Sequence, residues 1–167
     1  DKDSDRLNLF IFAIKMNNVP AVKALLALKL FNVNSIFNRQ SVIDIAWNAN
    51  NFDMVYALLM ANAKFPTNFD KLNSSDEILN FANDCENLDK LIKSHNARTN
   101  NIEKIKAIRN KYPELKHFYI FSKKDEKIIS LSAPYKAVFH LKYEIYECLG
   151  ESGVFFDPSE PLDEIIK

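Results

Sequence analysis

The sequence predicts an all-α fold, a stack of helical hairpins with one short β-hairpin as a candidate insertion. Apolar residues recur at helical spacing on both sides of an Asn-Asn pair over residues 40–63, and the same template recurs 33 residues earlier. A helix pair of this length cannot bury its own apolar face, so neighbouring pairs must stack to form a core. With 167 residues and 47% hydrophobic content, the chain is long enough for one domain over residues 1–167.

The first predicted repeat covers residues 8–34. Two helices are expected, joined by a turn at Asn17-Asn18, and Pro20 fits the first turn of the second helix, where its missing N–H has no intrahelical partner. Asparagine tolerates the left-handed backbone that glycine otherwise supplies in such turns. The apolar positions of the two helices are Leu9, Phe10, Ala13, Ile14, Val22, Leu25 and Leu26.

The second predicted repeat covers residues 35–66. A short extended connector over residues 36–40 precedes Ser41, whose hydroxyl is expected to cap the next helix. Another helix follows the Asn50-Asn51 turn. Phe65-Pro66 closes the repeat, because proline disfavours a helical conformation at the residue before it.

Residues 67–115 are predicted to be a divergent helical region without a clear repeat. One helix is expected to start at Ser75, another to follow Asn87, and a third to run from Ile102 to the neighbourhood of Pro113. Residues 116–131 are rich in aromatic and β-branched side chains around a polar turn, which fits a β-hairpin and an irregular loop equally well.

The last predicted repeat covers residues 132–154, where Ala137 takes the place that Ala46 has in the second repeat. Residues 155–167 are expected to form a capping tail with a short helix, since the end of a stack otherwise exposes an apolar face.

Composition bounds the classes of function. Lys plus Arg and Asp plus Glu number 22 each, so the basic excess that non-specific phosphate binding needs is missing and nucleic acid is disfavoured as a partner. The chain has no run of about 18 apolar residues, so no membrane span is predicted. Cys85 and Cys148 lie in helical apolar patterns and are expected to be reduced thiols, which favours an intracellular location, cytoplasmic or nuclear. Because the chain begins with Asp1, we expect it to be a piece of something longer.

The sequence lacks motifs that would carry chemistry. The two glycines, Gly150 and Gly153, are not followed by the lysine and hydroxyl residue of a phosphate-binding loop. His95, His117 and His140 have no partners at metal-ligand spacing. No Cys-His pair comes with an orienting third group. We therefore expect no enzyme activity, no catalytic residue, no metal site and no cofactor.

The second repeat resembles the ankyrin-repeat family. The family's helix-opening motif is matched at Ser41, Ile43, Asp44, Ile45 and Ala46. Its second-helix and closing pattern is matched at Asp53, Met54, Val55, Leu58, Leu59, Asn62 and Ala63. The resemblance covers residues 8–65 and, in part, residues 132–154. Departures from the family pattern are Val42 in place of a proline, Asn17 and Asn50 in place of turn glycines, and Trp47 in place of a small alanine.

This resemblance implies a non-catalytic protein–protein interaction scaffold, which binds a protein partner through a concave surface. Members of the family use their loop tips and inner helix face for binding. The corresponding residues in this sequence are Phe37, Asn38, Gln40, Asn48 and Ala49. For Phe37, packing against the neighbouring repeat is an alternative of equal weight.

Two other classes of function are kept as alternatives. One is a regulatory or targeting domain of a larger enzyme or toxin. The other is an RNA-associated helical module that uses residues 116–127, where Lys123, Lys124 and Lys127 stand near aromatic residues. Asp125 and Glu126 dilute this positive charge, so a solvated hairpin tip is the preferred interpretation of the segment.

Overall fold

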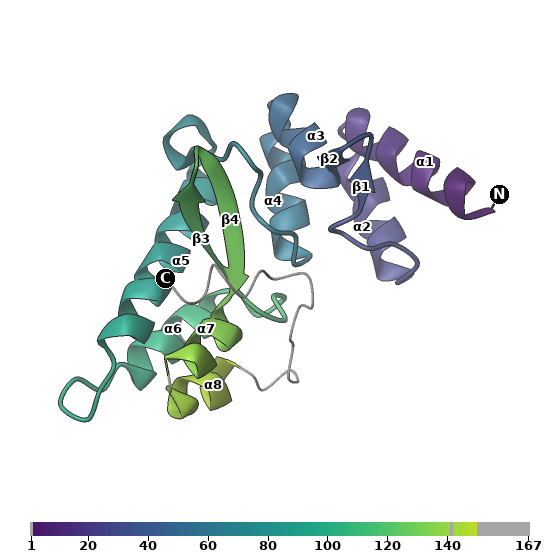
Figure 1. Ribbon diagram of the computed structural model, residues 1–167. Coiled ribbons are helices and arrows are strands. Elements are labelled where there is room, and N and C mark those ends of the chain that lie inside the picture. Colours follow the sequence, from purple (N-terminus) through teal and green to yellow (C-terminus); the bar gives the residue numbers. More distant parts are fainter. Residues whose placement is uncertain (1, 141, 150–167) are drawn as a thin grey trace. The chain divides into compact units, whose positions relative to one another are not determined.

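A computed structural model describes residues 2–140 and 142–149 of the chain (Figure 1). These residues form two compact units. The first unit consists of the residues up to 79 together with residues 126–128, and the second of residues 80–125 together with those from 129 onward. The single repeat domain over residues 1–167 and its subdivisions stay a prediction, and the predicted capping tail lies outside the described residues.

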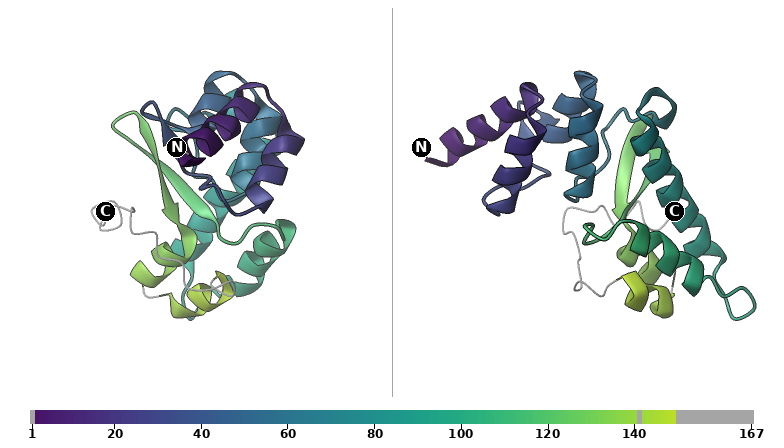
Figure 2. Two further views of the ribbon diagram at one scale, coloured as in Figure 1. Left: turned by 90° about the vertical axis from the view of Figure 1, so that its right-hand side faces the viewer. Right: turned by 180° about the vertical axis from the view of Figure 1, so that it is seen from behind.

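The predicted all-α class is wrong. The described residues form eight α-helices and also two small antiparallel sheets of two strands each (Figures 1 and 2). The turns of both hairpins have positive φ at both central residues, 49° and 66° at Asn38-Arg39 and 49° and 64° at Asp125-Glu126. Positive φ at both central residues is what a type I′ turn requires, one of the two favoured two-residue connections of a hairpin. The chain is therefore a mixed α and β protein and not a pure stack of helical hairpins.

In the first unit, the predicted helix pair at the start of the chain is present. Helix α1 (Lys2–Lys15) and helix α2 (Val19–Ala27) are joined by a tight turn in which Asn17 has a φ of 53°. Asn18 caps α2, since its side-chain oxygen accepts a hydrogen bond from the backbone N–H of Ala21 at 3.1 Å. Asparagine thus fills both the left-handed position and the capping position of this turn.

The second helix pair of this unit is introduced by a hairpin where the sequence predicted an extended connector. Strand β1 (Ile36–Phe37) pairs with strand β2 (Gln40–Ser41), with Ile36 opposite Ser41 and Phe37 opposite Gln40. Helix α3 (Val42–Asn48) and helix α4 (Phe52–Met60) follow. As predicted, Ser41 caps α3 through a 3.2 Å hydrogen bond from the backbone N–H of Asp44. Helix α1 packs on α3, and α2 packs on α4.

The core of the first unit is apolar and continues past α4 into an aromatic cluster. Trp47 lies within 5.5 Å of Phe52 and 5.3 Å of Phe69, ring centre to ring centre, and Phe65 and Phe69 are 4.9 Å apart. The bulky side chain that departs from the ankyrin pattern is therefore packed by other aromatic rings. The largest fully buried side chains of this core are Phe10, Ile14, Ile43, Met54, Leu58, Leu59 and Ile78.

One polar contact fixes the segment after α4. The carboxylate of Asp44 accepts hydrogen bonds from the backbone N–H of Thr67 at 2.7 Å and from its hydroxyl at 2.9 Å. Asn34 acts similarly on the preceding loop, because its side-chain oxygen accepts the backbone N–H of Lys64 at 2.9 Å. A short 3₁₀ helix, η1 (Lys71–Asn73), then leads to the next element.

Helix α5 (Asp76–Ser94) is one continuous helix of 19 residues, and the predicted break at Asn87 is wrong. Apolar residues follow one another at spacings of three and four across the whole helix, and Asn87 lies on its exposed face. Because the buried stripe is uninterrupted, the modest helix penalty of one exposed asparagine does not end the helix. The buried stripe consists of Ile78, Phe81, Ala82, Cys85, Leu88, Leu91 and Ile92.

The second unit is built around the greater part of α5. It contains helix α6 (Ile102–Lys111), strands β3 (Tyr119–Lys124) and β4 (Lys127–Ser132), helix α7 (Ala133–Phe139) and helix α8 (Tyr143–Leu149). The strands confirm the hairpin and exclude the irregular loop. Helices α7 and α8 form the last predicted pair, and both pack within this unit, α8 also against α6. Its buried residues include Phe81, Ile92, Ile105, Ile108, Phe118, Ile120, Leu131, Ala137, Ile145 and Leu149.

Candidate functional site

The predicted partner-binding residues lie at the two ends of α3. Asn38 and Gln40 are exposed on the β1–β2 hairpin, which precedes the helix, while Asn48 and Ala49 are exposed where the helix ends. Seven residues of α-helix separate these groups by roughly 10 Å along the axis. The structure therefore places the predicted residues in two groups, one at each end of α3, and does not gather them into one cluster.

Phe37 does not project as an isolated aromatic. Its side chain is half-buried, and the ammonium of Lys15, in the last turn of α1, lies 5.6 Å from the centre of its ring. The hairpin residue that does project is Ile36, which is 64% exposed. Sequence reasoning did not select Ile36, because a two-residue strand carries no periodic signal that separates its inner from its outer face.

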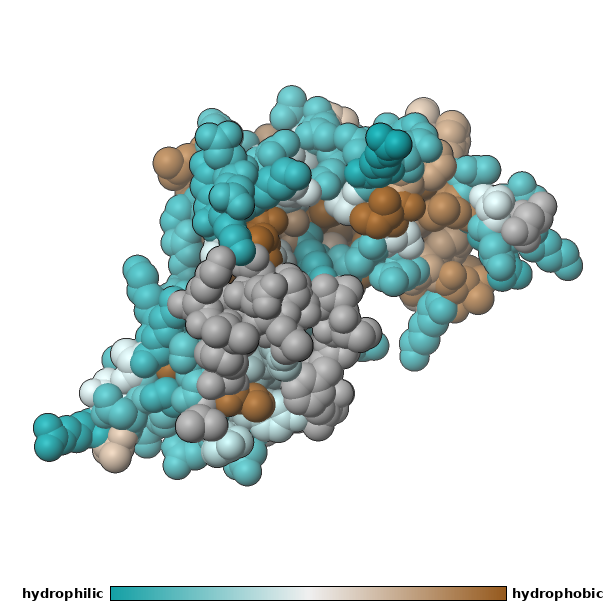
Figure 3. All heavy atoms as spheres, in the orientation of Figure 1, coloured by the Kyte–Doolittle hydropathy of each residue, from teal (hydrophilic) through white to brown (hydrophobic). Residues whose placement is uncertain are grey.

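A shallow groove on α1 and α2 of the first unit is lined almost entirely by apolar residues. Four large side chains in it are more than half exposed: Leu9 by 54%, Phe12 by 61%, Met16 by 64% and Leu28 by 60%. Its volume is about 480 Å³, and none of its lining residues is charged. Figure 3 shows hydrophobic residues gathered over the region of α1 and α2. The groove is lined by Leu9, Phe12, Ala13, Met16, Asn18, Ala21, Ala24, Leu25 and Leu28.

Sequence reasoning missed this groove, although a signal for it was present. Leu9 was predicted to belong to the core face of the first helix. Apolar residues occupy almost every position from Leu9 to Met16, so they surround α1 and are too many for one buried stripe. A helix that is apolar on more than one face needs a second covering surface, which the described residues do not supply for the groove.

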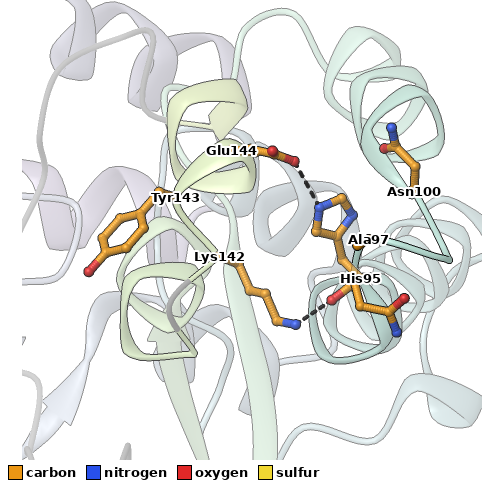
Figure 4. A pocket seen from close by; sticks show the side chains of 7 residues that line it. His95, Ala97, Asn100, Lys142, Tyr143 and Glu144 are labelled. Atoms are coloured by element: carbon orange, nitrogen blue, oxygen red, sulfur yellow. Dashed lines mark hydrogen bonds and ion pairs between the residues drawn. The ribbon is translucent and has the colours of Figure 1, made fainter.

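The second unit carries a more polar hollow of about 540 Å³ between the loop after α5 and the start of α8 (Figure 4). The ring of His95 points towards the carboxylate of Glu144, whereas Tyr143 points away from them. Lys142 donates a hydrogen bond to the backbone carbonyl of His95. The lining is completed by Asn96, Ala97 and Asn100.

Both ring nitrogens of His95 are engaged. Nδ1 accepts the backbone N–H of Asn101 at 3.0 Å, which fixes the neutral ring with its proton on Nε2, and Nε2 lies 3.1 Å from a carboxylate oxygen of Glu144. A general base needs a free nitrogen within hydrogen-bond reach of its substrate. His95 has none in this arrangement, so we interpret it as a latch that holds the loop after α5 to α8.

A second polar cluster joins α5 to α7. Asp89 receives a hydrogen bond from Lys93 at 3.0 Å on one carboxylate oxygen. Its other oxygen, Oδ1, is buried and lies 2.5 Å from Nζ of Lys136, with which it forms an ion pair. Burial raises the pKa of Asp89, but its contacts with Lys136 and Lys93 outweigh burial and hold that pKa below the ordinary value.

The pKa values of two basic residues in this cluster, Lys136 and His140, are lowered as well. Burial lowers the pKa of Lys136 by more than the Asp89 carboxylate raises it. Burial, followed by the charges of Lys136 and Lys93, lowers the pKa of His140. The cluster therefore favours an ionised carboxylate and disfavours additional positive charge, which is the behaviour of a structural ion pair in a partly desolvated position.

The two cysteines are thiols without a disulfide bond, as predicted. Cys85 lies in the core of the second unit, and burial, with smaller contributions from Asp84 and Glu86, raises its pKa far above neutral pH. The thiolate is the nucleophilic form, so Cys85 is unreactive in this position.

The described residues contain no group of three or more His, Cys, Asp or Glu side chains arranged to hold a metal ion. Within the same part of the chain, none of the helices is both long enough and apolar enough to cross a bilayer. Comparison of the chain with protein families, with curated proteins and with solved structures gave no match.

Proposed function

We propose that the chain is a non-catalytic protein-binding module and that its first unit makes the contact. The observation that carries this proposal is the uncharged apolar groove of α1 and α2, in which four large side chains are more than half exposed. Monomeric proteins rarely expose apolar patches of this kind unless another molecule covers them.

The rigidity of the surface supports the same function. The groove is built on two helices joined by a tight turn, so little conformational entropy is lost when a partner binds. The resemblance of residues 8–65 to ankyrin repeats is an independent argument for protein binding. Phe37, Asn38 and Gln40 on the β1–β2 hairpin, and Asn48 and Ala49 at the far end of α3, remain proposed contacts, with Ile36 added because it is exposed.

The proposal is tested by site-specific photo-crosslinking in a native extract. Benzoylphenylalanine is introduced in the full chain at Phe12, in the groove, or at Lys104, which is exposed on α6 of the second unit. We expect a discrete protein adduct from the first position and none from the second. Equal labelling from both positions, or no adduct from Phe12, contradicts protein binding through the groove.

The hairpin surface is tested in the same way. The crosslinking residue replaces exposed Gln40, and the adduct is compared with that from Phe12. The same protein captured from both positions assigns the hairpin to the same interface. An adduct from Phe12 alone confines the contact to α1 and α2.

A further inference from the structure

The first two helix pairs repeat one another at the level of the backbone, so their positions can be compared one by one. Asn17 and Asn50, 33 residues apart, have φ values of 53° and 56°. The hydrogen bond from Asn18 N to Ala13 O recurs between Asn51 N and Ala46 O, and both are 3.0 Å long.

Equivalent positions in the two pairs differ sharply in burial. Leu9 is 54% exposed, whereas Val42, the residue 33 positions later, is fully buried. Leu25 is only half-buried, whereas its equivalent Leu58 is fully buried. The difference has a simple cause: α1 packs on α3 and α2 packs on α4, so the second pair is covered on the side where the first pair is open. The equivalents of the groove residues that are 7% exposed or less are Val42, Ala46, Met54, Ala57 and Leu58. The equivalents of Phe12 and Leu28, Ile45 and Ala61, are half-buried, and Ala49, the equivalent of Met16, is exposed.

The buried side chains of the first helix pair indicate which kind of side chain packs well against such a groove. The large side chains of α1 and α2 that are fully buried are Phe10, Ile14 and Val22, and all three are uncharged. We propose that the groove is a docking site for a helix pair of a partner protein that presents a similar row of large apolar side chains. This inference rests on the proposed protein-binding function and names the class of partner.

A second copy of this chain cannot present the row Phe10, Ile14 and Val22 without unfolding, because that row is buried inside its first unit. Self-association through the exposed groove side chains is distinguished by sedimentation velocity. The lining also excludes a charged peptide, because none of its residues could pair with a desolvated charge. An external helix pair would extend the packing that already joins the first two pairs.

The docking geometry is tested by a full-length variant in which residues 9–41 occur twice in succession. The segment has the length of one repeat, so the first copy places its Phe10, Ile14 and Val22 against the groove of the second copy. Trp47 is the only tryptophan of the chain and lies outside the duplicated segment, so its fluorescence reports on the original unit.

If the inference is correct, the duplication adds helical signal in circular dichroism and raises the midpoint temperature of the Trp47 transition by at least about 5 °C. The matched control carries Phe10→Glu and Ile14→Glu in the first copy only, and no rise is expected. An unchanged midpoint in the unsubstituted duplication overturns the inference.

The partner class is tested by mapping the adduct from the crosslinker at Phe12. We expect it to lie on a helical segment with large apolar residues at spacings of three and four. An adduct on an extended or charged segment overturns the inference and leaves protein binding intact, while the absence of an adduct overturns both. Sedimentation velocity is the last measurement. A dimer of the unsubstituted chain that is dissociated by Phe12→Glu would show self-association through the groove and would contradict the inference.

Discussion

His95 makes two hydrogen bonds that differ greatly in their surroundings. Its side chain is 8% exposed and its contact with the backbone N–H of Asn101 is buried, whereas Glu144 is 74% exposed. A buried donor that loses its acceptor costs free energy, while a hydrogen bond to an exposed carboxylate contributes little. The hydrogen bond from the Asn101 backbone N–H to Nδ1 of His95 therefore contributes more to stability than the contact with Glu144.

His95→Ala is expected to lower the free energy of unfolding by about 2–3 kcal/mol, because it leaves the Asn101 amide unsatisfied. Glu144→Gln is the matched control, and we expect a change within about 0.5 kcal/mol. Urea denaturation of both variants measures the difference. Equal losses in the two variants contradict the assignment of His95 as a latch.

Asp89 makes stability depend on pH in the acid range. Because its pKa is lower in the folded protein than in the unfolded chain, the ionised carboxylate stabilises the fold above the unfolded pKa, about 4. This stabilisation is lost as the pH falls through the lowered pKa of the folded state. A lowered pKa is the direction expected for a carboxylate that is paired with cations.

Asp89→Asn is accordingly expected to lower the free energy of unfolding by about 1–2 kcal/mol at pH 7, since it leaves Lys136 partly buried without its counter-ion. The difference from the unsubstituted protein should shrink as the pH falls below about 4, where the carboxylate of the unfolded chain becomes protonated, and should vanish below the lowered pKa of the folded state. Denaturation curves at several pH values check this. A difference that stays constant down to the acid end would show that the ion pair is not the cause.

Among the helices and strands, the helix ends show where local chemistry governs the fold. Asn17 and Asn50 take left-handed conformations that asparagine tolerates, and Asn62 does so after α4 with a φ of 73°. The equivalent residue after α2 is Lys29, whose φ is 57°. A lysine in this region is strained, because its Cβ lies too close to the backbone.

Lys29→Gly is therefore expected to stabilise the protein by about 0.5–1 kcal/mol, since glycine adopts positive φ without strain. The matched control is Lys23→Gly, an exposed position inside α2, where the same change should destabilise by about 1 kcal/mol. Thermal unfolding of both variants shows whether the signs are opposite. Two changes of the same sign refute the backbone argument.

Helix α5 and the hairpins show what local patterns left unpredicted. Asn87 looks like a boundary when only its neighbours are considered, but the stripe from Ile78 to Ile92 runs past it and is buried throughout. The β1–β2 hairpin has strands of two residues, too short for any alternating pattern to be visible. In both cases, packing and turn geometry outweighed local sequence preference.

Across the molecule, burial separates residues that look alike in the sequence. Leu58 is fully buried in the first unit, whereas Leu28 is 60% exposed in the groove. We expect Leu58→Ala to lower the free energy of unfolding by about 2–5 kcal/mol and Leu28→Ala by less than about 1 kcal/mol. Trp47 fluorescence reports on this unit for both variants, and similar losses would contradict the division between core and groove.

Local sequence was enough to predict the helix pairs of residues 8–63, their asparagine turns and the Ser41 cap, because these depend on side chains within a few positions of one another. The folded arrangement was needed to show that Leu9 and Phe12 are exposed while Val42 and Leu58 are buried, and that His95 meets Glu144. Those outcomes depend on which faces other elements cover. Helical periodicity shows that a face is apolar, but it does not show whether a neighbour lies against it.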